Sequence, residues 1–266
     1  MADRPILFSA PMVRALLDGR KTQTRRLCAW ANNPNSPPLS YIVACDEPGW
    51  FGDEEGDVQF QVPYAVGDRL WVRETCRAEE LSRPPQVRPA NTRERQLLKR
   101  TEVIEIDDLD GVDGVRYMAD AHWQRIENSF DAGEAWSKMF HYRGRGKGQI
   151  GNTVTAIHMP RWASRLTLTV TDVRVERLQD CSADDAIAEG IAVGKPMPDL
   201  VPNSMGDIYH DGITDPIDGW SRDPRLAYAR LRNAINGAGA WEANPWVVAV
   251  SFTVGRHNID AEASNA

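Results

Sequence analysis

Apolar and polar residues alternate most regularly between positions 166 and 178. This segment reads LTLTVTDVRVERL, with threonine, valine and charged residues in turn. A two-residue period predicts a β-strand with one buried face, and the length and composition favour a curved barrel strand or a hairpin arm. A second strand, mostly apolar and buried, is predicted at 245–254.

A shorter strand is predicted at 68–74, where Leu70, Val72 and Glu74 share one face. An inward carboxylate is costly unless it is paired or protonated, so Glu74 is either an ion-pair partner or a functional group. A change of register by one residue would turn Glu74 outward, and both interpretations stay open.

Short helices are predicted at 9–19, 182–190 and 223–237. Each begins at a serine or aspartate of the kind that caps a helix and ends at a glycine. Because the first helix stops at Gly19, we expect the basic segment after it to form a loop or an edge strand whose side chains can face a ligand.

Strands dominate this pattern, so the predicted fold class is α+β, a small mixed β-barrel with short flanking helices and long loop insertions. A single domain would span 1–256 and a disordered tail 257–266. The expected insertions are irregular and lie near 28–62, 77–157 and 193–222, with a strand-like segment at 101–106 and a turn at 110–114.

Composition narrows the function classes. The 266 residues carry a net charge of −7 and a pI near 5.3, which argues against nonspecific coating of nucleic acid. A local basic patch remains compatible with these values. No apolar run is long enough to cross a bilayer, and we expect a soluble cytoplasmic protein that does not bind membranes. The four cysteines are scattered and predict neither a disulfide framework nor a zinc site.

Candidate chemistry concentrates at 19–26, where GRKTQTRR places two hydroxyls and four cations in eight residues. Convergence of Lys21, Thr24 and Glu74 on one pocket would make an acyl-transfer site or a site for an anionic or nucleotide ligand. A second basic segment, the glycine-rich 141–148, suits a loop that closes over phosphate or a plain solvated loop.

The order of these features resembles the ASCH domain of the PUA-like superfamily. The resemblance rests on Gly19-x-Lys21-x-x-Thr24-x-Arg26 and on Gly67-Asp68 before a strand that ends in Glu74. The segments 4–9, 158–165 and 244–246 are also similar to phage- and prophage-encoded proteins that are sometimes labelled morphogenetic proteins.

The resemblance implies a cleft for nucleic acid, RNA in preference to DNA, or for a free modified nucleoside. Small members of the family are amidohydrolases that deacetylate N4-acetylcytidine with a lysine, a threonine and a glutamate, here Lys21, Thr24 and Glu74. No cofactor and no metal are implied. The remaining candidate ligand-binding residues are Gly19, Arg25, Arg26, Arg73, Arg161 and Trp162.

In the implied reaction Thr24 is the nucleophile and Lys21 its base, with a pKa lowered by neighbouring cations and partial burial. Glu74 would orient the lysine or protonate the leaving amine, and Arg26 would anchor phosphate or hold the carboxylate. Three alternatives remain: the cluster only caps a helix and pairs with surface acids, it binds nucleic acid without chemistry, or the barrel is an interaction module of a phage accessory or assembly protein.

Overall fold

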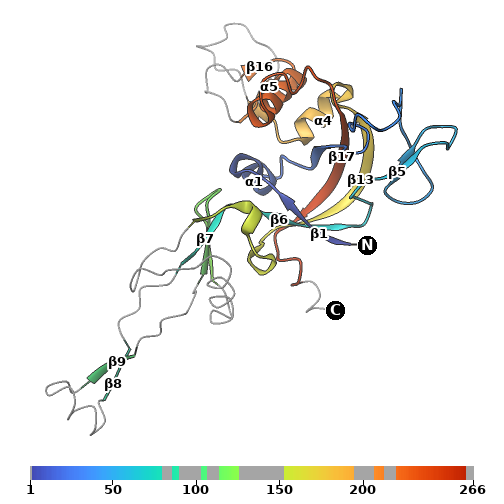
Figure 1. Cartoon of the computed structure of the whole chain (residues 1–266). Helices are drawn as coiled ribbons and strands as arrows, with labels where there is room; N and C mark the ends of the chain where they lie inside the picture. Colours follow the sequence, from blue (N-terminus) through green and yellow to red (C-terminus); the bar gives the residue numbers. More distant parts are fainter. Residues whose placement is uncertain are drawn as a thin grey trace, which may run out of the picture. The chain divides into compact units, whose positions relative to one another are not determined.

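The computed structural model of the chain (Figure 1) contains two compact units, which we treat separately. The first comprises Met1–Arg73 and Pro160–Ala266, and the second comprises Glu74–Met159. The residues that the structure describes are 2–79, 86–89, 103–106, 114–125, 153–194, 207–212 and 220–261, with the backbone alone at 78–79, 86–89 and 103–106.

The first unit is built on a five-stranded sheet with the order β1-β6-β13-β17-β2. Its strands are β1 (Asp3–Leu7), β2 (Gln23–Leu27), β6 (Arg69–Arg73), β13 (Thr167–Arg177) and β17 (Trp246–Gly255). Only β1 and β6 run parallel, and the register of the long β13–β17 pair shifts between Val170 and Asp172. The two long predicted strands are confirmed, and the basic segment after the first helix is an edge strand, β2.

The sheet is open, so the prediction of a closed barrel is wrong for the described strands. β1 pairs only with β6, and β2 pairs only with β17, which leaves both as edges. A side chain spans part of the gap between these edges, because the guanidinium of Arg26 donates to the carbonyl oxygen of Leu7 at 2.5 Å. The coarser prediction of an α+β fold rich in sheet is confirmed.

Three α-helices lie in the described part of the chain, close to their predicted positions: α1 (Ala10–Leu17), α4 (Ala183–Ala188) and α5 (Pro224–Asn236). Figure 1 shows them on one side of the long β13–β17 pair and β5 on the other. Ser182 and Asp185 form a reciprocal capping box on α4, and Asp223 caps α5. Ser9 precedes α1 without a capping hydrogen bond from its side chain, so its predicted capping role is wrong.

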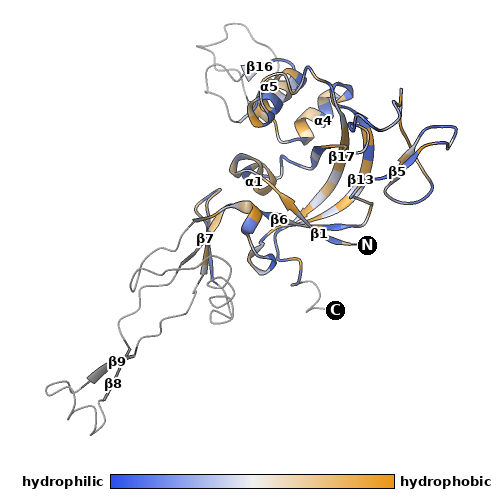
Figure 2. Ribbon diagram, viewed as in Figure 1, coloured by the Kyte–Doolittle hydropathy of each residue, from blue (hydrophilic) through white to orange (hydrophobic). Residues whose placement is uncertain are grey.

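The core of this unit forms where the helices cover the sheet. α5 carries both hydrophobic and hydrophilic residues (Figure 2), and its Ala227, Tyr228 and Leu231 are buried. Burial of large apolar side chains is the main force that holds such layers together. Fully buried partners from the helix and strands around them are Val13, Leu16, Leu70, Leu168, Val247 and Val250.

Short sheets occupy two of the segments predicted to be irregular. One contains β3 (Val43–Ala44), β4 (Trp50–Gly52) and β5 (Gln59–Gln61), and the other contains β14 (Ala192–Gly194), β15 (Ile208–His210) and β16 (Trp220–Ser221). Trp30 stacks on Phe60 of β5, with ring centroids 4.3 Å apart and planes 4° apart. Such contacts between aromatic rings give a proline-rich segment its own small core.

The second unit contains a four-stranded sheet with the order β11-β10-β7-β12 and a separate antiparallel β8–β9 pair. Its strands are β7 (Cys76–Glu79), β8 (Gln86–Pro89), β9 (Val103–Ile106), β10 (Gly114–Tyr117), β11 (Trp123–Arg125) and β12 (Thr153–Val154). The strand predicted at 101–106 is confirmed as β9. The predicted turn at 110–114 lies outside the described residues except for its last position, and the loop at 141–148 lies outside them entirely.

Residues 257–261 are not a disordered tail, so that prediction is wrong for them. Ile259 is completely buried, and the side-chain amide of Asn258 donates to three backbone carbonyls of the 161–164 segment. These contacts hold residues 257–261 against the rest of the first unit. Positions 262–266 lie outside the described residues. None of the described helices has the length and apolar character needed to span a bilayer.

Candidate functional site

A pocket of about 300 Å³ lies in the first unit where β1, α1, β2 and α5 meet the end of α4. This volume is at the lower end of the range for small-molecule sites, roughly 300–1,000 Å³. Its polar or charged lining residues are Ser9, Lys21, Thr24, Arg25, Arg26, Glu189, Tyr228, Arg232 and Asn236. The pocket therefore contains most of the basic cluster that the sequence singles out.

Two glycines shape the chain around Lys21. Gly19 has a φ of +74°, and the turn that it allows places the backbone amide of Lys21 3.0 Å from the carbonyl oxygen of Ala15. Gly190 has a φ of +102°, and a Cβ there would lie 3.0 Å from Cβ of Ala15 and 3.2 Å from Cβ of Lys21. Gly190 thus lets the end of α4 approach α1 and Lys21 closely.

Lys21 and Glu189 form a buried ion pair. The ammonium nitrogen of Lys21 lies 2.8 Å from Oε2 of Glu189 and 2.8 Å from the Glu189 carbonyl oxygen. Burial lowers the pKa of Lys21; the Glu189 carboxylate opposes this effect, while the charges of Arg26 and Arg25 lower the pKa further. The shift has the direction that the sequence predicts for a catalytic base, but the acid that contacts the ammonium is Glu189.

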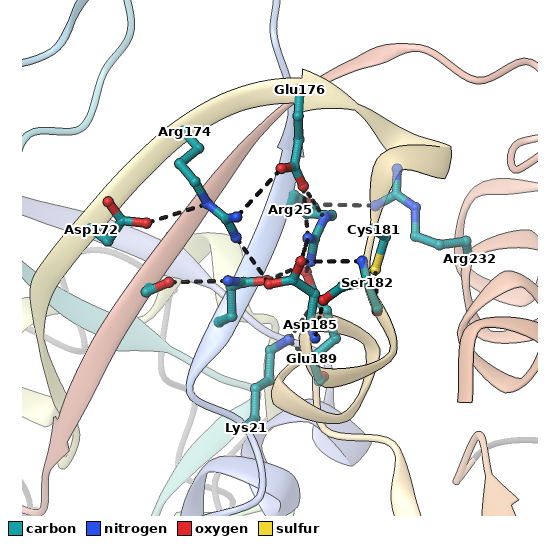
Figure 3. Close-up of polar contacts among 12 residues, drawn as sticks. Lys21, Arg25, Asp172, Arg174, Glu176, Cys181, Ser182, Asp185, Glu189 and Arg232 are labelled. Atoms are coloured by element: carbon teal, nitrogen blue, oxygen red, sulfur yellow. Dashed lines mark hydrogen bonds and ion pairs between the residues drawn. The ribbon is translucent and has the colours of Figure 1, made fainter. Parts of the chain in front are cut away.

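Arg25 organises the carboxylates around this pair (Figure 3). Its guanidinium lies 2.7 Å from Glu176, 3.2 Å from Asp185 and 3.3 Å from Oε1 of Glu189, and its side chain has no exposed surface. Burial lowers the pKa of Arg25, but the facing carboxylates, Glu189 foremost, raise it to a net value above that of a free arginine. Arg25 therefore stays charged and fixes the position of Glu189.

Arg174 is a further cation of this network and contacts three of its acids (Figure 3). It contacts Asp172 at 3.3 Å, Asp185 at 2.9 Å and Glu176 at 3.7 Å. Burial raises the pKa of Asp185, yet hydrogen bonds from Gln23 and Ser182 and the charge of Arg25 outweigh burial and leave the pKa well below its usual value. Asp185 is consequently held in its ionised form.

The Thr24 hydroxyl is available for chemistry. Thr24 is nearly buried and lines the pocket, and its hydroxyl makes no hydrogen bond with any residue that the structure describes. The strand pairing of Thr24 with Val250 fixes its backbone in β2. A hydroxyl on a rigid strand that is not used by the protein itself is suited to contact a ligand.

Arg26 and Arg232 differ from Lys21 and Arg25 because no described carboxylate pairs with either of them. Each is half-buried and donates one hydrogen bond to a backbone carbonyl, Arg26 to Leu7 and Arg232 to Arg25 at 3.4 Å. Their Nε atoms are buried and have no hydrogen-bond partner among the described groups. An acidic chain that leaves two guanidiniums without acids beside one pocket indicates a site for an anion.

Tyr228 is a third pocket residue with a buried hydrogen-bond donor that no described group accepts. Its side chain is 1% exposed, and its hydroxyl has no hydrogen-bond partner within the described part of the chain. Burial raises the pKa of Tyr228 well above its usual value, and the nearby Glu189 carboxylate adds to this shift. The phenol is therefore neutral, and a buried hydroxyl without a partner costs folding free energy unless something else satisfies it.

The other predicted binding residues lie elsewhere in the first unit. Gly19 forms the turn before Lys21, and Arg73 lies over the Trp71 ring at 5.1 Å. Arg161 is held by Asp3 and Asp260, each at 2.6 Å. Among the predicted ligand-binding residues, Arg25 and Arg26 line the pocket, whereas Arg73, Arg161 and Trp162 do not.

Glu74, the predicted third catalytic group, directly follows β6 and is the first residue of the second unit. It is 1% exposed, as the expected inward orientation requires. Its role in catalysis stays a prediction.

Four residues that matter for the pocket were not singled out from the sequence: Phe8, Glu189, Tyr228 and Arg232. A signal for two of them was present, because Tyr228 and Arg232 are four residues apart and share one face of the predicted last helix. Glu189 precedes the glycine that ends the second predicted helix, but its distance along the chain from Lys21 gave no indication of contact.

The site thus combines a buried lysine with a lowered pKa, a hydroxyl without a hydrogen bond to described residues, and two guanidiniums without acids. Within the described ranges, no group of three or more histidine, cysteine or acidic side chains is arranged to hold a metal ion. The chain matches no protein-family model, no curated protein and no solved structure.

Proposed function

We propose that this pocket binds a nucleotide or a modified nucleoside and that Lys21 and Thr24 hydrolyse an N-acyl group such as that of N4-acetylcytidine. The proposal assigns the first unit to the ASCH type of PUA-like domain. One observation carries it: Lys21 and Thr24 line the same pocket as Arg26 and Arg232, whose guanidiniums have no acid partner among the described residues.

The pocket residues that hold hydrogen-bond donors without partners favour such a ligand. Arginine Nε–H groups can only donate, and Arg26, Arg232 and Tyr228 all hold donors without partners in the described structure. The pocket acid Glu189 is already engaged by Lys21 and Arg25. A ligand that fits must therefore be rich in acceptors, as phosphate oxygens and the O2 and acyl oxygens of an acylated pyrimidine are.

The reaction follows from the same groups. The Thr24 oxygen attacks the acyl carbon while neutral Lys21 takes the hydroxyl proton, and the C–N bond to the base breaks as that nitrogen receives this proton from the Lys21 ammonium. Water then hydrolyses the Thr24 ester to release the carboxylic acid and regenerate the hydroxyl. A lowered pKa of Lys21 raises the fraction of neutral amine, and Glu189 holds that amine in place.

The test is release of cytidine and acetate from N4-acetylcytidine, separated by chromatography. Wild-type protein should turn the substrate over, Thr24→Val should be inactive because it keeps the branched shape without the hydroxyl, and Lys21→Arg should be inactive because arginine keeps the charge without acting as a base. Glu74→Gln tests whether Glu74 protonates the leaving amine. Absence of cytidine release by folded wild-type protein would remove the hydrolase proposal.

A second candidate function is binding without turnover. It is favoured by the 1% exposure of Lys21 and by its two short contacts with Glu189, which suit a structural ion pair as well as a base. In that case the protein binds cytidine nucleotides with an affinity that falls as salt rises, wild-type protein releases no cytidine from N4-acetylcytidine, and Thr24→Val weakens the affinity because it removes a hydroxyl that contacts the ligand. An assembly or interaction module would show neither turnover nor nucleotide affinity.

A further inference from the structure

A second pocket adjoins the first. Its volume is about 240 Å³, and it shares Leu7, Arg26 and Leu27 with the first pocket. Its remaining walls come from β1, Val248 of β17, the chain after β2, and the end of β5 with the segment that follows it. The two pockets therefore meet at the gap between the edge strands β1 and β2, which the Arg26 side chain spans.

Arg26 lies where the two pockets meet, and most of its hydrogen-bond donors are not used by described residues. Its guanidinium carries five N–H donors, and its one hydrogen bond goes to the Leu7 carbonyl. It also lies over the Phe8 ring at 5.2 Å, which orients the guanidinium without neutralising it. No carboxylate in the described part of the chain pairs with it, so its charge is complementary to an anionic group placed where the pockets meet.

The second pocket is lined by aromatic and apolar groups. Trp30 is half-buried and already stacked on Phe60, so its ring loses little freedom when a further planar group packs beside it. Tyr64 is half-buried as well, and its hydroxyl has no hydrogen bond to a described residue. Among the described residues, Arg26 is the only charged one that lines this pocket.

We propose that the second pocket takes the neighbouring base of a single-stranded nucleic acid whose linking phosphate lies on Arg26 and whose first nucleoside occupies the first pocket. This proposal rests on the proposed function and makes the preferred ligand a segment of at least two nucleotides. Base stacking on a held aromatic ring and a phosphate on a free guanidinium are the two contacts by which proteins bind single strands. A free mononucleotide would leave the second pocket unused.

Calorimetric titration of the full-length protein with cytidine 5′-monophosphate and with the dinucleoside monophosphate CpC tests this directly. CpC carries less negative charge than the mononucleotide, so tighter binding of CpC cannot come from charge alone. We expect CpC to bind wild-type protein about ten-fold more tightly, the gain that one stacked base gives. Ribose and deoxyribose forms are titrated in parallel to distinguish RNA from DNA.

The key variant is Ala29→Phe. Ala29 is exposed and lines only the second of these two pockets, so phenylalanine fills that pocket without removing a core side chain. The variant should lose the gain for CpC and keep its affinity for the mononucleotide. Ala238→Phe, at an exposed position outside both pockets, is the matched control and should behave as wild type. Trp30→Ala, checked for folding by circular dichroism, should also lose the gain.

The outcomes separate the two proposals. A gain for CpC in either sugar form that Ala29→Phe abolishes supports the second site. Equal affinity for the mononucleotide and CpC, or a gain that survives both Ala29→Phe and Trp30→Ala, overturns the second site while nucleotide binding by the first pocket stands. If neither ligand binds, nucleotide binding by the first pocket fails and the second site fails with it.

Discussion

The ammonium of Lys21 and the carboxylate of Glu189 meet at 2.8 Å, although the two residues are 168 positions apart in the sequence. Both are almost completely buried, and Arg25 contacts the second carboxylate oxygen at 3.3 Å. One carboxylate therefore serves two buried cations, a lysine with a lowered pKa and an arginine that stays charged. Fold stability and the protonation of the candidate base depend on the same side chain.

Glu189→Gln should destabilise the fold by about 3 kcal/mol, because removal of one partner leaves a buried charge uncompensated. Urea unfolding followed by circular dichroism measures the change in the free energy of unfolding. The matched control is Glu55→Gln, at an exposed position, which should change stability by less than about 0.5 kcal/mol. Equal stability of the two variants would mean that the Lys21–Glu189 pair contributes nothing to the folded state.

Asp185 should make stability depend on pH in the acid range. Because its folded-state pKa lies below the usual 3.8, the unfolded chain binds more protons there, and the stabilisation is present above pH 3.8 and lost as pH falls toward the lowered folded-state pKa. Asp185→Asn should be less stable than wild type at neutral pH and show a flatter decline of stability below pH 3.8. A decline as steep as that of wild type would assign the acid sensitivity to other carboxylates.

The four cysteines are free thiols and should differ widely in reactivity. Burial raises the pKa of Cys181 to about 12 from the usual 9.0, and burial also raises the pKa of Cys28. Since the thiolate is the reactive form, a disulfide reagent at about pH 8 should label the half-exposed Cys45 first and leave Cys181 and Cys28 unlabelled until the protein unfolds. Peptide mass spectrometry identifies the sites. Labelling of Cys181 as fast as Cys45 would show that the network around Arg25 opens readily.

Local signals in the sequence predicted the helices and long strands well. Ser182 and Asp223 cap their helices through residues two or three positions away, and the alternation in β13 lies within one strand. A single short segment is therefore enough to recognise each of these signals. Whether the sheet closes into a barrel was not predictable in this way, because closure depends on whether β1 meets β2, and no local pattern encodes that pairing.

The residues of the site likewise fall into those that lie close together in the sequence and those that only tertiary packing brings together. Lys21, Thr24 and Arg26 are close in sequence and line one pocket. Glu189 and Arg232 reach that pocket from α4 and α5, which fold onto β2 only through tertiary packing. Buried Ile259, in the segment expected to be a tail, illustrates the same limit: its packing depends on contacts far away in the sequence.

Tyr228→Phe distinguishes a hydroxyl built for a ligand from one left unsatisfied by the packing of α5. The phenol is 1% exposed and has no hydrogen-bond partner in the described structure, so its removal should raise the free energy of unfolding by about 1 kcal/mol. If the hydroxyl binds the ligand, the same variant should weaken binding of cytidine 5′-monophosphate about ten-fold. Urea unfolding and calorimetric titration give the two values. Tyr209→Phe, in β15 and outside the pocket, is the control. Higher stability with unchanged affinity would show that the Tyr228 hydroxyl takes no part in recognition, and the donors that select the ligand would then be those of Arg26 and Arg232.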